Sequence, residues 1–483
     1  MLARRAVRSI WKRKPDKAQT EMSVPCPAFF LEFFMDFLTG KIKPLYFKYL
    51  GAAFGSALIS SIYGLVDMAM VGQYQGPEGT AALAVVAPVW NVIYSLGLLM
   101  GIGGSVIFST KRGLAEKSEK ESSSSGKITC RSVASEENIY FTASVIGSVI
   151  LALISWLAII FFEAPILRFF GANDNLLPLA SDYLKPICFV LPLFLFNQML
   201  AAFLRNDGNP NLATAGVLSG GIFNVFGDYF FVFTCDMGIY GAGLATAIGS
   251  VISFIVMCSH FFTKKNTLKL VKVCELFRRL KEISTVGFST FFIDVAMGIL
   301  TILFNRQIMK YLGADALAVY GPVINVSTFV QCCAYSVGQA AQPIISTNYG
   351  AGQTARIRQT LHLALWTTAV FAIFWTVLSE LAPNLYIRIF MTPSENILKI
   401  GPGIIRSYSL SFLLLPFNIF STYYFQAIMK PKTAFVVSVA RGCVISGILI
   451  MVLPLIFAPS SIWFAMPITE VVVAVYVAVK MIF

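Results

Sequence analysis

An acid and an amide interrupt the apolar stretch at 217–246, and they are the residues of this chain best suited to chemistry. Asp228 follows Asn224 by four residues, so the two side chains lie on one face of a helix. There the amide can donate a hydrogen bond to the carboxylate or share a cation with it. A lone carboxylate in a membrane-length apolar run costs about 2.5 to 3.5 kcal/mol on insertion scales, which indicates a functional site. The alternative is that the pair only holds neighbouring helices together.

The elements that must position these side chains are transmembrane helices. Hydrophobic residues make up 57% of the 483 residues and charged residues 13%, about half the charged fraction of a soluble protein. Apolar runs of about twenty residues indicate helices, because the strands of a membrane barrel are about half as long and alternate. We therefore predict an all-α integral membrane protein with twelve spans, at 45–71, 80–109, 139–162, 178–204, 211–235, 240–262, 286–311, 316–347, 358–382, 400–429, 432–457 and 460–482.

The net charge of +13 follows the membrane and does not indicate a nucleic-acid partner. Lys and Arg concentrate before the first span, after the second span and in 263–285, whereas the first, fifth and eleventh connections contain neither. The positive-inside rule places the basic segments and both termini in the cytoplasm. We therefore expect a multi-pass protein of the cell membrane. The nine Cys are scattered without metal spacing, so neither a disulfide framework nor a zinc site is indicated.

The two halves of the chain repeat each other. Gly79, Pro88 and Asn91 have counterparts 234 positions later, and Asn197 and Pro210 have counterparts 221 positions later. Six helices per half is an even number, so both halves enter the membrane in the same direction and face each other across a cavity. We expect a basic tail with an interfacial helix at 1–43, a six-helix bundle at 44–262, a cytoplasmic linker at 263–285 and a second bundle at 286–483.

Several motifs, taken together and in order, resemble the MATE family of multidrug and toxic compound extrusion transporters. They are 66–72, 79–85, 101–105, 205–210, Asn224 with Asp228, and 238–246. The resemblance covers the chain from about residue 28 and implies a V-shaped pair of pseudo-symmetric bundles. It implies a secondary active antiporter that exports organic cations or amphipathic drugs in exchange for protons or sodium ions by alternating access. We expect a monomer in the lipid bilayer, without a cofactor.

The resemblance also implies where the coupling cation binds. Acids of the first bundle hold this cation in family members, and their matches here are Asp67, Tyr183, Asn224, Asp228 and Thr246. Two carboxyl groups, an amide and a hydroxyl inside a bundle can hold either a proton or a small cation such as Na⁺. Sodium would use Asp67, Asn224 and Asp228. For Asp67, which lies near the outer end of its span, a purely interfacial role is the alternative.

The second bundle carries three charged residues at apparent membrane depth. Asp294, with Asn197 and Gln198 of the first bundle, is a candidate for a second cation or substrate site. The alternative for Asp294 is a buried pairing with Arg441 or another polar group. We expect Arg441 and Glu470 to form an internal ion pair.

Two other functions are alternatives to antiport. A flippase of the related lipid-linked saccharide exporters is the alternative, but those proteins often have extra spans and a basic cavity for a pyrophosphate. A membrane-embedded enzyme would need convergent acids, a His pair or a metal site. The two histidines, His260 and His362, lie in different halves, so we predict that the protein is not an enzyme.

Overall fold

The structure is a computed structural model that describes residues 37–124, 136–390 and 394–482, and the spans in these residues are all helices. Ten helices in this part of the chain are long and apolar enough to cross a membrane, and a pair bent by 61°, α4 (Leu176–Cys188) with α5 (Leu191–Asn206), adds one span. The first helix, α2 (Ile42–Ser124), counts once among the ten but contains two spans. The described residues therefore hold the twelve predicted spans. Most of the predicted tail and interfacial helix lies outside them.

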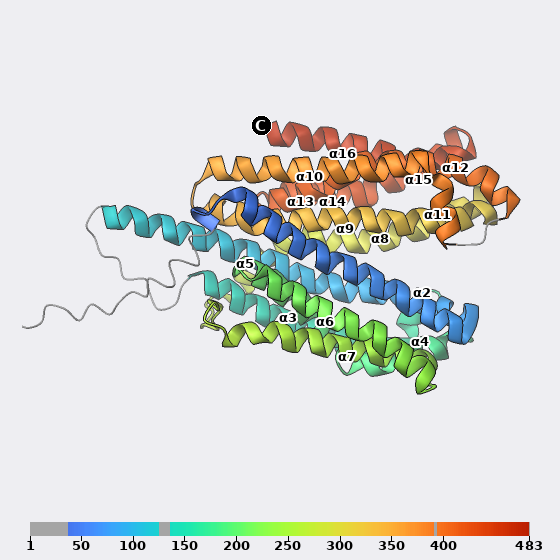
Figure 1. Cartoon of the computed structure of the whole chain (residues 1–483), viewed down its shortest axis with the longest axis horizontal. Helices are drawn as coiled ribbons and strands as arrows, with labels where there is room; N and C mark the ends of the chain where they lie inside the picture. Colours follow the sequence, from blue (N-terminus) through green and yellow to red (C-terminus); the bar gives the residue numbers. More distant parts are fainter. Residues whose placement is uncertain (1–36, 125–135, 391–393, 483) are drawn as a thin grey trace, which may run out of the picture.

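The two spans of α2 meet at Gly76, whose φ of 67° and ψ of −153° are not helical. This backbone conformation is open to glycine at little cost because glycine has no Cβ. The chain reverses there, so the first arm of α2 (42–75) and the second arm (77–124) run antiparallel (Figure 1).

The first bundle is completed by helices that follow in sequence. Pro210 opens α6 within its first turn, where its missing N–H costs nothing. Besides α2, α4 and α5, this bundle contains α3 (Glu136–Phe169), α6 (Pro210–Asp228) with the π-helical η1 (Tyr229–Thr234), and α7 (Gly238–Cys258) with the short η2 (Ser259–Phe262).

The second bundle lies beside the first and is drawn from yellow to red in Figure 1. It contains α8 (Leu276–Tyr311), α9 (Ala314–Gly350), α10 (Thr354–Leu381), α11 (Pro383–Phe390), α12 (Glu395–Ser409), η3 (Leu410–Leu413), α13 (Leu415–Ala427), α14 (Pro431–Val439), η4 (Ala440–Val444), α15 (Ile445–Ile456), η5 (Pro459–Phe464) and α16 (Ala465–Ile482).

The segment at 263–285, predicted as a linker, is helical from Leu276 onwards. Helix α8 begins at Leu276, before the predicted start of its span at 286. Hydropathy detects only the apolar part of a helix, whereas this polar first section is supported by ion pairs of Arg278 with Glu275 and Glu282 at helical spacing. The non-helical connection is thus limited to 263–275.

This connection is fixed to the first bundle through the buried carboxylate of Asp207. Arg112 Nη1 donates to Asp207 Oδ1 over 3.1 Å, and His260 Nε2 lies 2.8 Å from Asp207 Oδ2. The backbone N–H of Thr267 donates to the same Oδ2 over 3.0 Å. A buried carboxylate needs such charged or polar partners. Because Thr267 belongs to the connection, this hydrogen bond holds the connection against the first bundle.

The internal repeat predicted from the sequence is present as a repeated hydrogen bond. Asn197 Nδ2 donates to the carbonyl oxygen and the Oγ of Ser250, both over 3.0 Å. Its counterpart Asn418 Nδ2 donates to the carbonyl oxygen of Glu470 over 2.9 Å and to its Oε2 over 2.7 Å. Both bundles also contain a π-helical turn, η1 and η4, which follows α6 in one and α14 in the other.

The two bundles meet through glycines near the basic end of the molecule, the end that carries Lys111, Lys264 and Lys430. A Cβ on Gly103, Gly113, Gly287 or Gly350 would collide with a backbone carbonyl oxygen of the other bundle. Small residues let helix backbones approach closely inside a membrane, where packing and not water exclusion drives association. By contrast, a Cβ on Gly298, farther along α8, would have nothing within 4 Å.

These contacts predict a position-specific response to one methyl group. Gly287→Ala should lower the thermal unfolding temperature of the purified protein, since the methyl group meets the backbone of Leu99 and overpacking costs about 1–3 kcal/mol. Gly298→Ala, on the same helix, should leave it unchanged or raise it, because alanine favours helix by about 1 kcal/mol. Equal unfolding temperatures for the two variants would contradict the close contact.

Candidate functional site

The carboxylate of Asp67, on the first arm of α2, is the centre of a buried polar cluster. It accepts hydrogen bonds from Tyr183 Oη over 3.1 Å, Asn224 Nδ2 over 3.2 Å and Thr246 Oγ1 over 3.3 Å. These donors come from α4, α6 and α7. One carboxylate therefore joins four helices of the first bundle.

Close packing of α6 against α7 brings two of these donors together. A Cβ on Gly249 of α7 would lie 2.7 Å from the carbonyl oxygen of Gly220 on α6, so the two backbones nearly touch. One turn away, Asn224 Nδ2 donates to Thr246 Oγ1 over 3.0 Å. Gly220 and Gly249 thus set the distance between the side chains of Asn224 and Thr246.

Asp228 lies in the same cluster but has no donor. Its side chain is fully buried, and neither carboxylate oxygen has a hydrogen-bond partner among the described residues. The oxygen Oδ1 of Asn224 is also buried without a partner, and the carboxyl groups of Asp67 and Asp228 are close enough to interact. Buried polar atoms are normally satisfied.

This surplus of acceptors determines what the cluster can bind. A proton shared between Asp67 and Asp228 would supply a missing donor, and a small cation such as Na⁺ would supply a positive charge to the same oxygens, which are the ligands that hard cations prefer. The structure therefore brings together all five residues predicted from the resemblance, and they fit a proton or a small cation.

Asp294 lies apart from this cluster, between the two bundles. Its Oδ1 accepts from Tyr335 Oη of α9 over 3.3 Å, and its Oδ2 accepts from Ser95 Oγ of the second arm of α2 over 3.4 Å. Within the described residues, no hydrogen bond or ion pair joins Asp294 to Asn197 or Gln198. Asn197 is turned into the first bundle towards Ser250, so the combined site of Asp294, Asn197 and Gln198 stays a prediction.

The surroundings of Asp294 were not predicted. Tyr94 and Tyr423 lie near enough to interact electrostatically with its carboxylate, in addition to the contacts of Ser95 and Tyr335. The residues come from three helices that are far apart in the sequence, so no spacing signal could have identified them.

Arg441 and Glu470 form the ion pair that the sequence predicted. Arg441 Nε donates to Glu470 Oε1 over 2.7 Å, and the two side chains are 5% and 0% exposed. Asn418 donates to the other carboxylate oxygen of Glu470. Asp294 is therefore not needed as the partner of Arg441.

The two acids of the first bundle should respond in opposite ways to the same change. Asp67→Asn should lower the thermal unfolding temperature, because the amide weakens hydrogen bonds from three donors and an unsatisfied buried group costs about 1–3 kcal/mol. Asp228→Asn should leave it unchanged or raise it, since the amide replaces a buried carboxylate that has no donor. Both unfolding temperatures are measured on protein without added sodium. An unfolding temperature that falls in Asp228→Asn but not in Asp67→Asn would contradict this geometry.

Curated relatives match most of this chain. The Multidrug export protein MepA of Staphylococcus saprophyticus is 25% identical over 409 residues, which is 84% of this chain and 86% of that protein. The protein of the same name from Staphylococcus aureus strain MSSA476 is 23% identical over 408 residues, with the same coverage of both chains.

Solved structures share the fold. The MATE multidrug transporter DinF-BH superposes with a TM-score of 0.80 and 26% identity, covering 92% of this chain and 96% of that one. An outward-facing conformation of a multidrug resistance MATE family transporter gives a TM-score of 0.79 at 20% identity, covering 91% and 95%. The predicted V-shaped fold of two six-helix bundles is thereby confirmed. The sequence model of the MatE family matches residues 52–121, 136–230 and 288–453, so this chain belongs to the MatE family, whose members are transport proteins and not enzymes.

Proposed function

We propose that this protein is a multidrug efflux transporter of the plasma membrane that exports cationic or amphipathic compounds in exchange for protons or sodium ions. The observation that carries the coupling is the set of buried oxygens around Asp67 and Asp228 that have no donor. The names of the relatives support the export of drugs. Both termini lie in the cytoplasm, the transporter acts as a monomer, and no cofactor takes part.

The gradient across the membrane supplies the free energy. One cation that moves inwards releases about 2.3 kcal/mol per 100 mV. Export requires that cation loading at Asp67 and Asp228 and drug binding favour different conformations, so that each displaces the other through a shared equilibrium. Alternating access of the two bundles provides these conformations.

The first arm of α2 provides a physical link between the cation cluster and the second bundle. Asp67 belongs to this arm, and so do Tyr46 and Ser61. Tyr46 Oη lies 2.6 Å from Thr367 Oγ1 of α10, and Ser61 Oγ lies 2.9 Å from Cys332 Sγ of α9. A shift of this arm on cation loading would therefore act on both bundles.

The cationic end of the exported compound pairs with Asp294 in this proposal. A carboxylate between the bundles with Tyr94, Tyr335 and Tyr423 around it combines a negative charge with aromatic faces, which attract organic cations. The same carboxylate is the candidate for a second coupling cation. Aromatic surfaces also accept varied apolar groups, as a multidrug site requires.

Reconstituted vesicles test this function. Purified protein in liposomes should transport the dye rhodamine 6G under an imposed pH gradient or an imposed sodium gradient, and the gradient that drives it identifies the coupling ion. Asp67→Asn and Asp228→Asn should each slow transport at least tenfold, since each removes a cation-binding carboxylate. The exposed Asp174, 88% exposed at its side chain, offers a matched control as Asp174→Asn.

Two results would contradict the proposal. Transport at the parental rate by both Asp67→Asn and Asp228→Asn would show that these carboxylates do not bind the coupling cation. Failure to transport any amphipathic cation under either gradient would instead favour a flippase of the related lipid-linked saccharide exporters.

A further inference from the structure

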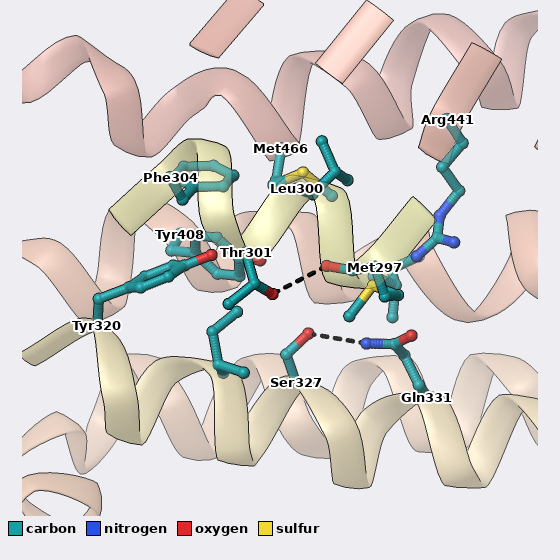
Figure 2. A pocket seen from close by; sticks show the side chains of 12 residues that line it. Met297, Leu300, Thr301, Phe304, Tyr320, Ser327, Gln331, Tyr408, Arg441 and Met466 are labelled. Carbon is teal, nitrogen blue, oxygen red and sulfur yellow. Dashed lines mark hydrogen bonds between the residues drawn. The ribbon is translucent and has the colours of Figure 1, made fainter. Parts of the chain in front are cut away.

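A pocket lies inside the second bundle, and its lining includes no residue of the first-bundle cluster (Figure 2). Helices α8, α9, α12, α13 and α16 and the π-helical η4 enclose it with mostly apolar and aromatic side chains, among them Met297, Phe304, Tyr320, Tyr408 and Met466. In this conformation it has room for about one water molecule. A carboxylate therefore enters only when flexible lining side chains such as Met297 and Met466 move aside.

Arg441 supplies a charged donor to this pocket. The side chain is buried, and its guanidinium group is directed towards Met297 at the pocket (Figure 2). Its Nε is used by Glu470, but Nη2 is buried without an acceptor among the described residues. A buried guanidinium N–H without a partner is a strong site for an oxygen acceptor, above all for a carboxylate.

Glu470 and Asn418 hold this donor in place. The carboxylate of Glu470 accepts from Arg441 Nε over 2.7 Å and from Asn418 Nδ2 over 2.7 Å. With Nε fixed in this way, the planar guanidinium presents Nη2 in one direction. Glu470 and Asn418 are therefore positioning residues, and Arg441 is the group that would touch a ligand.

The internal repeat relates this pocket to the cluster of the first bundle. The offset of 234 positions that relates Gly79 to Gly313 also relates Asp67 to Thr301, which lines this pocket. Within the first-bundle cluster, the buried atoms without a partner are oxygens that accept, at Asp228 and Asn224. In the second bundle the unpartnered Nη2 of Arg441 donates, so a cation fits the first site and an acceptor fits the second.

The pocket adjoins the carboxylate of Asp294. Met297 follows Asp294 by three residues on α8, and Gln331 precedes Tyr335 by four residues on α9, so the pocket continues along the face that carries the Asp294–Tyr335 hydrogen bond. Tyr335 also interacts electrostatically with both Asp294 and Arg441. A carboxylate and a guanidinium group thus both lie near one tyrosine.

We infer that the Arg441 pocket binds the carboxylate end of amphipathic compounds whose cationic end pairs with Asp294. The second bundle then selects molecules that carry both charges, and Arg441 determines this preference. The inference rests on the proposed export of amphipathic compounds and names their chemistry. A single bound water at Nη2 is the competing occupant.

A pair of dyes with one fluorophore tests this inference. Rhodamine 110 carries a free carboxylate, and rhodamine 123 is its methyl ester, so they differ only in the group that Arg441 would bind. Binding of each dye to the full chain in lipid nanodiscs is measured by fluorescence polarisation. The parental protein should bind rhodamine 110 about tenfold more tightly than rhodamine 123.

Variants of the protein test separately the binding of the carboxylate end and of the cationic end of the dye. The double variant Arg441→Gln with Glu470→Gln leaves no buried charge unpaired and should lose the preference for rhodamine 110 while it binds rhodamine 123 within twofold of the parent. Asp294→Asn should weaken both dyes by a similar factor. Arg168→Gln, a change at an exposed arginine with 58% side-chain exposure, should alter neither.

Each remaining outcome decides the inference. An unchanged preference in the double variant overturns it and leaves water as the occupant, with the proposed export intact. If neither dye binds the parental protein, the proposed function and the inference both fail. If the double variant does not bind rhodamine 123, the single variant Arg441→Lys is measured instead, because lysine keeps the charge but not the fixed N–H direction. Loss of the preference for rhodamine 110 in this variant supports the inference. An unchanged preference for rhodamine 110 overturns it.

Discussion

A buried carboxylate without water must find its donors in the protein, and this constraint explains the arrangement of the first bundle. Asp67 obtains three donors from three helices, and they reach it only because α6 and α7 approach through Gly220 and Gly249. A change in the charge or protonation of that carboxylate therefore acts on four helices at once. In this bundle, the packing of the helices thus determines the geometry of the acidic cluster.

The two bundles share one fold, as the internal repeat predicts, but they differ in the polar groups of their interiors. The amide of Asn197 and that of Asn418 make the same interhelical hydrogen bond, which fixes the frame of each bundle. Around this frame the Asp67 cluster of the first bundle holds acceptors without donors, whereas the pocket of the second bundle lies at the ion pair of Arg441 with Glu470 and holds a donor without an acceptor. A duplicated fold can thus serve two ligands of opposite charge.

The sequence predicted the features that depend on local pattern. Spans follow from apolar length, and the five residues around Asp67 follow from motifs that match the family position by position. The environment of Asp294 could not be predicted, because Ser95, Tyr335 and Tyr423 come from helices that only the packed structure brings together. The polar first section of α8 could not be predicted for another reason. Hydropathy detects apolar spans, whereas this section is polar and is stabilised by ion pairs of Arg278.

The glycine contacts between the bundles have a consequence for motion. At Gly103, Gly113, Gly287 and Gly350 backbone meets backbone, so there are no interlocking side chains to change rotamer when one bundle tilts against the other. In the proposed alternating access, such a surface would act as a pivot. The barrier to reorientation is then set by the polar contacts farther along the interface, such as that of Ser95 with Asp294, which a bound compound can replace.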